Sequence, residues 1–453
     1  MKHSVLILFL SISISFVSCK KENDKISATE VNEWIYSEMT DWYYWTDFLP
    51  SDPDYALSAP AFYNALLYEA DRFSFYYEDY ETLINLLNGV SLESGFEYQL
   101  YKDSDNPGKV YGVILYIKQG SPADQAGLKR GDLFRQVNGT DITESNFSSI
   151  REAMSAPYTL SYERYNFQNQ TFDKQPDLDL TPIQFAENPF LLDTILDISG
   201  NKVGYLVYTF FSPGATETSS EYTDQMDQIF QNYQAAGLSH IIVDLRFNSG
   251  GSERSIRNLA SYLVPSAYTE RFVMKKQYNQ EVQDYILNEP SLGTDYLQIQ
   301  FSNKSANIGD QVSGNGITFI TADHTASASE ALMNSLKPFQ TIHVVGDTTV
   351  GKDVGSITIY DENHSNNRIG LQPIIVKIVN DLEEDYPNGF TPEVPIEDRF
   401  KVLYPLGSMD EPLLQAAIDN IFGVSARQAK FEMSTDQPLR SSIPNRSLKV
   451  LSP

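Results

Sequence analysis

The chain has 453 residues, more than one hydrophobic core usually supports, so two or three domains are expected. Hydrophobic residues make up 41% and charged residues 21%, and 28 Tyr and 25 Phe supply large apolar side chains, which argues against a disordered protein. The formal net charge of −27 argues against nucleic acid and anionic membrane surfaces as partners.

The first 19 residues have the pattern of a secretion signal. Lys2 and His3 precede an apolar run from Val5 to Val17, which is too short to cross a bilayer comfortably. The run ends at Cys19, the only cysteine, and Phe16-Val17-Ser18-Cys19 resembles a bacterial lipobox with Phe16 at the position usually held by Leu. The resemblance implies lipidation of Cys19 and a protein anchored to a membrane of the bacterial cell envelope, facing the periplasm or the surface. The alternative is a plain signal peptide with an unrelated cysteine.

Residues 20–88 predict a tether followed by a small helical domain. Ser27-Ala-Thr-Glu30 is a capping-box pattern, and a helix follows it. Further helices are expected at Ala61–Ala70 and Tyr80–Leu87. The many Trp and Tyr residues are interpreted as the core of this domain, and a cleft for a small apolar ligand is the competing interpretation.

Residues 89–165 change to short alternating strands, which are expected at Phe96–Tyr101, Val110–Ile117, Leu133–Val137 and Tyr158–Arg164. A helix is expected at Asn146–Ala156, before the last of these strands. Between them stand Ser-Pro-Ala, Ala-Gly-Leu, Gly-Asp and Val-Asn-Gly in the stretch from Ser121 to Gly139. This series resembles the PDZ module of bacterial proteases, which binds a peptide as an added strand. By that resemblance the loop before the first strand, with Gly95 and Phe96, holds the terminal carboxylate of a peptide. A PDZ fold that only supports its neighbours is the alternative.

Residues 166–425 are expected to form a connector, up to about residue 198, and then an α/β core. Strands and helices alternate in this core, which predicts a largely parallel sheet with helices on both faces. The expected elements are strand 203–211, helix 221–236, strand 240–245, helix 252–263, strand 317–321, helix 327–337 and strand 341–345. Residues 426–453 lose periodicity and are expected to be a loosely packed tail.

Two loops of the core carry the groups expected to be reactive, because such groups gather where parallel strands end. The loop from Asp244 to Gly251 has paired glycines, Gly250 and Gly251, ahead of a helix, an arrangement that exposes main-chain N–H groups to an anion. Ser327 stands at the next turn from strand to helix, where the N–H of Ala328 is free to stabilise negative charge. Taken alone, Ser327-x-x-Glu330 is equally an ordinary capping box.

Lys352 follows the next strand, between glycines, and the strand order places it at the same edge of the sheet as Ser327. Free lysine has a pKa of about 10.4 and is a poor base at neutral pH. Burial disfavours the ammonium ion, so a buried Lys352 would be able to accept the proton of Ser327.

Asp-Leu-Arg-x-Asn-x-Gly-Gly, Thr-Ala-Ser-Ala-Ser-Glu and Gly-Lys stand in this order, and together they resemble the carboxyl-terminal processing (tail-specific) peptidases. The likeness runs from about residue 26 to 400 and includes Asp71-Arg-Phe-Ser74. It implies a ClpP/crotonase-like α/β serine protease core with no cofactor or metal. The roles that it implies are nucleophile for Ser327, general base for Lys352, orientation for Glu330, and oxyanion hole for Ala328 with Gly250 or Gly251.

One position departs from the family pattern. Many relatives carry Gln four residues after the Lys, where this chain has Ser356, so the third catalytic member stays open between Glu330 and Ser356. His324 has no companion acid in a familiar order and is interpreted as a loop residue. The expected function is hydrolysis of unfolded or C-terminally tagged polypeptides outside the cytoplasm. The alternative is a catalytically inactive, PDZ-containing peptide-binding lipoprotein of the envelope.

Overall fold

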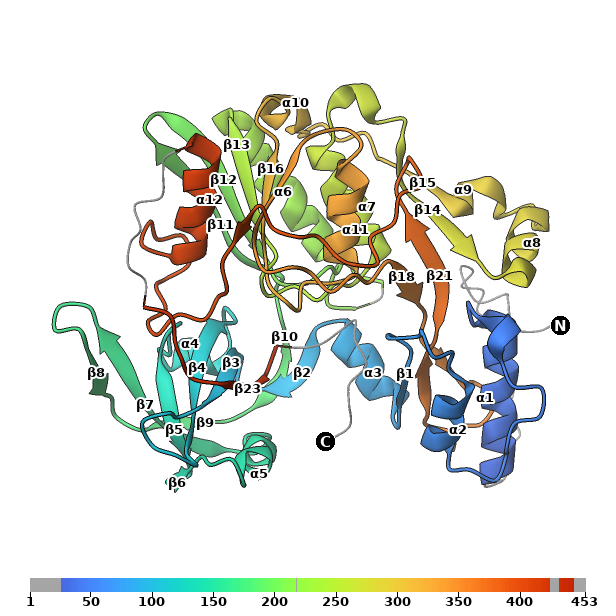
Figure 1. Ribbon diagram of the computed structural model, residues 1–453, viewed down its shortest axis with the longest axis horizontal. Helices are drawn as coiled ribbons and strands as arrows, with labels where there is room; N and C mark the ends of the chain where they lie inside the picture. The colour runs from blue at the N-terminus through green and yellow to red at the C-terminus, as the bar shows by residue number, and fades with distance from the viewer. Residues whose placement is uncertain (1–25, 217, 424–431, 444–453) are drawn as a thin grey trace.

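A computed structural model describes residues 26–216, 218–423 and 432–443. The three expected parts are confirmed: a helical N-terminal region, a PDZ domain and an α/β core. In Figure 1 the core lies above, with the PDZ domain below it at one end and the helical region at the other. The expected signal sequence and Cys19 lie outside the described residues. Across the part that is described, no helix is both long and apolar enough to span a bilayer.

The helical region begins as its capping box predicts. Ser27 Oγ accepts the N–H of Glu30 at 3.2 Å, and the Glu30 carboxylate accepts the N–H of Ser27 at 2.7 Å. The second helix ends at Leu66, not at Ala70, whereas the third has the predicted bounds. The elements are α1 (Ala28–Trp42), η1 (Thr46–Phe48), α2 (Ala59–Leu66), β1 (Phe75–Tyr77), α3 (Tyr80–Leu87) and β2 (Val90–Glu93).

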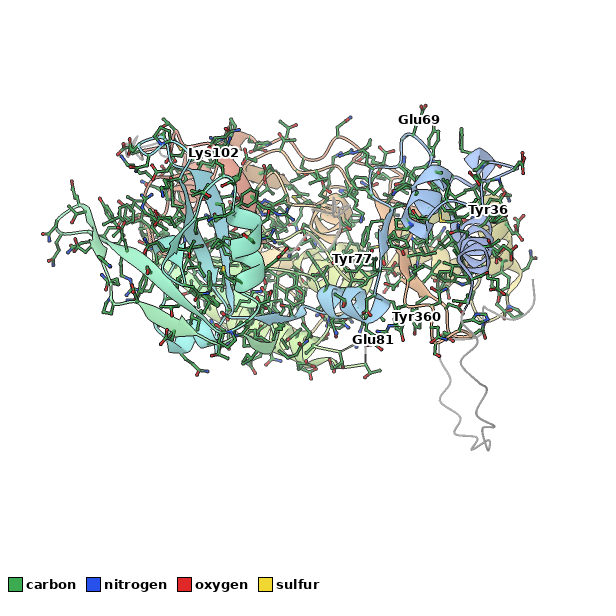
Figure 2. All side chains as sticks on the ribbon, turned by 90° about the horizontal axis from the view of Figure 1, so that it is seen from below. Tyr36, Glu69, Tyr77, Glu81, Lys102 and Tyr360 are labelled. Atoms are coloured by element: carbon green, nitrogen blue, oxygen red, sulfur yellow. The ribbon has the colours of Figure 1, made fainter. Side chains whose placement is uncertain are left out.

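The aromatic side chains of this region pack together with residues of the α/β core. Tyr43, Phe62 and Tyr63 are buried in one cluster with Ile359 and Leu371, which come from far along the chain. Strand β1 pairs with β20 (Gly370–Gln372), and the ring of Tyr80 stacks on that of Tyr360 at 4.4 Å. Figure 2 labels Tyr360 close to Glu81 at this contact. The helical region therefore packs against the core and shares a sheet with it.

The PDZ domain has the predicted strands around one hydrophobic cluster, with Phe96, Leu100 and Leu160 among its buried members. Its main sheet has the order β23-β3-β4-β5-β7-β8, in which β23 is Pro438–Ser441 and β8 is Thr171–Lys174. The expected helix at Asn146–Ala156 is shorter than predicted. The elements are β3 (Phe96–Lys102), β4 (Val110–Ile117), α4 (Pro122–Gln125), β5 (Leu133–Val137), β6 (Thr140–Asp141), α5 (Phe147–Ala153) and β7 (Tyr158–Asn166).

Residues 166–198, which the sequence predicts as a connector with no elements of its own named, form four strands. β8 (Thr171–Lys174) and β9 (Leu178–Leu180) extend the PDZ sheet past the expected boundary at residue 165. β10 (Ile183–Ala186) pairs with β2, and β11 (Phe190–Ile198) joins the core sheet antiparallel to β12 (Asn201–Tyr208). The polar composition of this stretch indicated a connector, but pairing with strands far along the chain stabilises strands here.

The core sheet has the order β11-β12-β13-β16-β17-β22, and all pairings after β12 are parallel, as predicted. Helices α6, α7 and α11 pack against it through one large hydrophobic cluster, and α12 belongs to a second cluster. The elements are α6 (Glu221–Ala236), β13 (His240–Asp244), α7 (Glu253–Leu263), β16 (Ile317–Thr321), α11 (Ala328–Leu336), β17 (Ile342–Gly346), β22 (Val394–Pro395) and α12 (Pro412–Phe422).

A second sheet, of order β15-β14-β21-β18, extends from the core toward the helical region (Figure 1). The sequence predicted no helix or strand for the residues of this sheet. The elements of the sheet and of the neighbouring segments are η2 (Ser266–Tyr268), β14 (Phe272–Tyr278), α8 (Gln280–Asn288), α9 (Gly293–Leu297), β15 (Gln298–Gln300), α10 (Gly309–Val312), β18 (Val354–Ser356), β19 (Ile359–Tyr360) and β21 (Ile374–Val379). Of these, β19 pairs with β20 and not with the second sheet.

The described residues of the expected loosely packed tail are exposed or half-buried, but they include a strand that the sequence does not predict. Residues 438–441 form strand β23 (Pro438–Ser441), which pairs antiparallel with β3 of the PDZ domain. Phe400 and Met433 form a further β-bridge between the tail and the core. The tail therefore contacts both the PDZ domain and the core.

Candidate active site

Ser327 stands at the sharp turn between β16 and α11. Its backbone angles, φ 56° and ψ −112°, are sterically unfavourable for any residue with a Cβ. Strain of this kind is retained where surrounding structure enforces it, and it occurs often at functional sites. The turn holds a half-exposed serine at the N-terminus of a buried helix.

Glu330, in the first turn of α11, is fully buried and accepts four hydrogen bonds. Oε2 accepts the main-chain N–H groups of Ser327 at 2.9 Å and of Lys352 at 2.8 Å. Oε1 accepts the N–H of Gly351 at 2.6 Å and the hydroxyl of Thr349 at 2.5 Å. Burial raises the pKa of Glu330, and these four donors oppose the rise. One carboxylate thus ties the turn of Ser327 to the loop of Lys352.

Lys352 lies in the loop that follows β17, and only 3% of its surface is exposed. Burial lowers its pKa to about 8, against the opposing effect of the negative charges on Asp71 and Glu330. Its Nζ lies 5.5 Å from the centre of the Phe73 ring. A lysine in this environment is neutral in a substantial fraction of molecules near pH 8 and is able to act as a base.

Gly351 fixes the path of this loop. Its φ is 80°, and a Cβ at this position would lie 2.2 Å from the carbonyl oxygen of Pro387. Residues 387–390 run directly behind the loop, where the N–H of Phe390 donates to Thr349 Oγ1 at 2.8 Å. Only glycine fits here, and its N–H is one of the four donors to Glu330.

The helical region supplies part of the surroundings of Lys352. The carboxylate of Asp71 accepts the N–H groups of Phe73 and Ser74, both at 2.9 Å, and the hydroxyl of Tyr43 at 2.7 Å. Arg72 donates to the carbonyl of Val350 at 2.9 Å. The sequence singled out Asp71-Arg-Phe-Ser74 only by resemblance, and it gave no sign that Asp71 and Phe73 flank the lysine.

The loop after β13 reaches the Ser327 turn through Asn248. Its carbonyl accepts the hydroxyl of Ser329 at 3.1 Å, and its side-chain oxygen accepts the N–H of Gly250 at 2.8 Å. The N–H of Gly250 is therefore engaged, which leaves Gly251 as the better match for the expected oxyanion role. A Cβ on Gly251 would lie 2.1 Å from the carbonyl oxygen of Phe211, so glycine is required there. Ala328, the other residue expected in this role, is the first residue of α11.

Arg246, in the same motif, has a structural position. It is buried and bonds to Asp244 at 2.8 Å and to Glu411 at 2.7 Å. Arg130 of the PDZ domain lies 3.6 Å from the same Glu411 carboxylate, so these charges join the PDZ domain to the core. Removing one partner would leave a buried charge without compensation.

Two other residues considered from the sequence have hydrogen-bond partners of their own. Ser356 Oγ accepts the side-chain amide of Gln372 at 3.0 Å, and His324 pairs with Asp323 at 3.0 Å. Glu330, not Ser356, is the residue that contacts both loops.

In the PDZ domain, the carbonyl of Gly95 accepts the N–H of Lys118 at 2.9 Å and the hydroxyl of Ser121 at 3.1 Å. The side chain of Phe96 is buried in the PDZ cluster, so only its main chain faces the sheet edge. Gly95 directly precedes β3 and Phe96 is its first residue.

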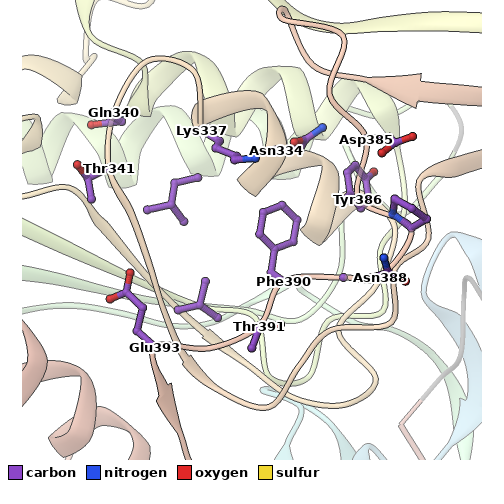
Figure 3. A pocket seen from close by; sticks show the side chains of 14 residues that line it. Asn334, Lys337, Gln340, Thr341, Asp385, Tyr386, Asn388, Phe390, Thr391 and Glu393 are labelled. Atoms are coloured by element: carbon purple, nitrogen blue, oxygen red, sulfur yellow. The ribbon is translucent and has the colours of Figure 1, made fainter.

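A pocket of about 620 Å³ lies behind the loop that carries Lys352, between the end of α11 and residues 385–393 (Figure 3). Tyr386 and Phe390 form one wall, with Lys337, Asp385 and Glu393 among the polar lining residues. Among the described residues, no cluster of His, Cys, Asp and Glu is suited to a metal ion.

Comparisons with known proteins find matches along three parts of the chain. Residues 202–394 match peptidase family S41, residues 30–75 match the peptidase S41 N-terminal domain, and residues 113–159 match a PDZ domain. The crystal structure of a Bacteroides fragilis protein assigned to the S41 proteases superposes with a TM-score of 0.72 at 26% identity, covering 87% of this chain and 98% of that one.

Two curated relatives are more distant. The carboxy-terminal processing protease CtpA of Bacillus subtilis is 23% identical over 63% of this chain and 54% of its own length. A CtpA-like serine protease of Staphylococcus aureus is 24% identical over 54% of this chain and 42% of its own length. The chain therefore spans about half the length of these two relatives.

Proposed function

The chain belongs to peptidase family S41, and we propose that it is a serine endopeptidase in which Ser327 is the nucleophile and Lys352 the general base. The observation that carries this proposal is the shared carboxylate of Glu330. It accepts hydrogen bonds from the main-chain N–H groups of Ser327 and Lys352. These bonds hold the strained turn of the serine next to the loop of a buried lysine whose pKa is lowered to about 8.

In the proposed mechanism, neutral Lys352 takes the proton of the Ser327 hydroxyl as Oγ attacks the carbonyl carbon of the substrate. The N–H groups of Ala328 and Gly251 stabilise the negative charge on the carbonyl oxygen. The ammonium of Lys352 then gives its proton to the departing amine, and an ester remains on Ser327. Water, deprotonated by Lys352, hydrolyses the ester and restores both groups.

The proposed substrates are unfolded or C-terminally tagged polypeptides, in keeping with the PDZ domain. We also propose that the protein acts in the bacterial cell envelope, held to a membrane by lipid on Cys19. Detergent partitioning of the full-length product tests this anchor. Partitioning into the detergent phase should be lost in Cys19→Ala, and an unchanged distribution would refute it.

Cleavage of a fluorescently labelled, disordered polypeptide tests the peptidase proposal. The chain from residue 20 onward is compared with Ser327→Ala and Lys352→Ala, each of which should lower kcat/KM by about 10³-fold or more. Lys337→Ala is the matched control, because this lysine is exposed and pairs with Glu384 at 3.1 Å. If wild type cleaves no better than Ser327→Ala, the protein is not a serine peptidase, and the inactive peptide-binding protein becomes the better account.

A further inference from the structure

The outer edge of the PDZ sheet is already paired. Strand β23 lies antiparallel along β3, with Arg440 opposite Leu100 and Ser441 opposite Gln99. The N–H of Lys102 donates to the carbonyl of Gln437 at 2.9 Å, and the N–H of Ser442 donates to the carbonyl of Tyr98 at 2.8 Å. Figure 1 shows β23 beside β3, and Lys102, at the end of β3, marks this edge in Figure 2. The tail thus occupies the edge at which PDZ modules add a peptide strand.

The tail also runs in the direction of a bound peptide. Pro438 lies opposite Tyr101, at the far end of β3, and Ser442 reaches Tyr98 near its start. Residues 438–442 therefore advance toward the loop with Gly95 that precedes β3. A peptide whose terminal carboxylate entered that loop would follow the same path.

Side chains of the tail fit this edge. Leu439 packs against the PDZ cluster, to which β3 contributes Leu100 and α5 contributes Ile150. Ser442 Oγ donates to the carboxylate of Glu97 at 2.5 Å and accepts the N–H of Tyr98 at 2.6 Å. The PDZ edge thus contacts an apolar side chain, Leu439, and a hydroxyl donor, Ser442, along an extended strand.

The approach to this strand is anchored as well. Asp436 accepts the hydroxyl of Tyr111 at 2.5 Å and the N–H of Ser104 at 3.1 Å. Further back, Glu432 pairs with Lys401 of the core at 2.9 Å. The tail therefore runs from the core surface to β3. Its contacts at Glu432 and Asp436 come before the residues that pair with the PDZ edge.

The added strand is short and shallow. It has four residues, of which Pro438 is exposed and Leu439, Arg440 and Ser441 are only half-buried. Segments with few buried contacts open at a small fraction of the free energy of global unfolding. A polypeptide with equivalent groups is therefore able to compete for the edge without unfolding the domain.

We propose that residues 436–443 are a built-in ligand of the PDZ edge, which an incoming polypeptide must displace before the domain binds it. The displacing segment is extended, carries a Leu-like side chain at the position of Leu439, and has a hydrogen-bond donor at the position of Ser442. Because the tail is tethered, its effective concentration at the edge is in the millimolar range. If the free tail sequence has a dissociation constant of about 10 µM for the opened edge, the tethered tail at about 1 mM weakens the binding of any competing peptide roughly 100-fold.

A binding experiment with the Ser327→Ala chain tests this inference independently of proteolysis. The probe is a fluorescent peptide with the sequence of residues 434–443, and its anisotropy is titrated with three proteins. These are the chain with an otherwise unchanged tail, the same chain with Leu439→Asp, and the same chain with Thr435→Asp. The last change is the matched control, since it adds the same charge at an exposed tail position.

Leu439→Asp should release the tail and tighten probe binding by about tenfold or more, while Thr435→Asp should leave it as weak as in the unchanged tail. A fourth protein, the same Ser327→Ala chain ending at residue 431, should bind the probe as tightly as the Leu439→Asp chain or more so. A probe that itself carries Leu439→Asp should bind none of them. Equal affinity for the unchanged and Leu439→Asp chains, or no binding to the shortened chain, would overturn the proposal. Loss of proteolysis in other assays would bear on Ser327 and not on this result.

Discussion

The main-chain N–H of Lys352 lies 2.8 Å from Glu330 Oε2, although 22 residues separate the two in sequence. The same oxygen accepts the N–H of Ser327, so a single carboxylate sets the positions of both residues in the proposed dyad. Glu330 therefore caps α11 and also fixes the lysine loop. In this arrangement it is a positioning residue, because its hydrogen bonds come from three main-chain N–H groups and from the hydroxyl of Thr349.

Glu330→Gln should lower kcat by about 10- to 100-fold with little change in KM. A glutamine amide has one acceptor oxygen, so two of the four buried donors lose their partner, at about 1–3 kcal/mol each. The matched control is Glu69→Gln at an exposed site, which should change neither kcat nor the melting temperature. A Glu330→Gln enzyme with normal kcat would show that this carboxylate does not position the dyad.

The pH dependence of cleavage should follow Lys352. Because its pKa is lowered to about 8 and its neutral form is the base, kcat/KM should rise about tenfold per pH unit below 8 and level off above it. Steady-state rates from pH 5.5 to 9.5 measure this profile. A plateau that already begins at pH 6 would exclude a lysine base with this pKa.

Lys352 should also make stability depend on pH. Its folded pKa of about 8 lies below the value of about 10.4 in the unfolded chain, so between these values the unfolded chain binds more protons. The contribution of this residue to the free energy of unfolding should therefore increase as the pH rises from about 8 to about 10.4. Lys352→Met should be more stable than wild type at pH 7, by up to about 3 kcal/mol, and lose this advantage near pH 10.5. Urea unfolding of both proteins at the two pH values measures the difference.

Asp71→Asn should shift the pH–rate profile to lower pH. The negative charge of Asp71 raises the pKa of Lys352, and removing it lets burial lower that pKa further. Asparagine keeps an acceptor oxygen for the N–H groups of Phe73 and Ser74, so the fold is expected to persist. Asp47→Asn, at an exposed site of the same region, is the control and should leave the profile unchanged.

Gly351→Ala should destabilise the protein by at least about 2 kcal/mol more than Gly120→Ala, and should abolish most activity. Both glycines have φ near 80°, so both substitutions carry the same backbone strain of about 1–2 kcal/mol. A Cβ at Gly120 meets nothing within 4 Å, whereas at Gly351 it meets the carbonyl of Pro387. Thermal unfolding of the two variants isolates the cost of the clash, and equal melting temperatures would contradict it.

The sequence predicted many elements accurately where the signal is local. The cap at Ser27, the helix at Tyr80–Leu87 and the strand at Leu133–Val137 have their expected bounds, because capping groups, turn glycines and apolar periodicity act over a few residues. Residues 166–198 were missed, since their strands are stabilised by partners far along the chain.

The site divides in the same way. By itself the sequence determined that Ser327 lies at a turn from strand to helix and that Lys352 follows the next strand, because βα order fixes the edge of the sheet. Only the tertiary structure decided that Glu330 joins the two main chains, that Gly250 is engaged by Asn248, and that the tail pairs with β3. It also decided the lowered pKa of Lys352, since burial comes from side chains that fold around the lysine from other parts of the chain.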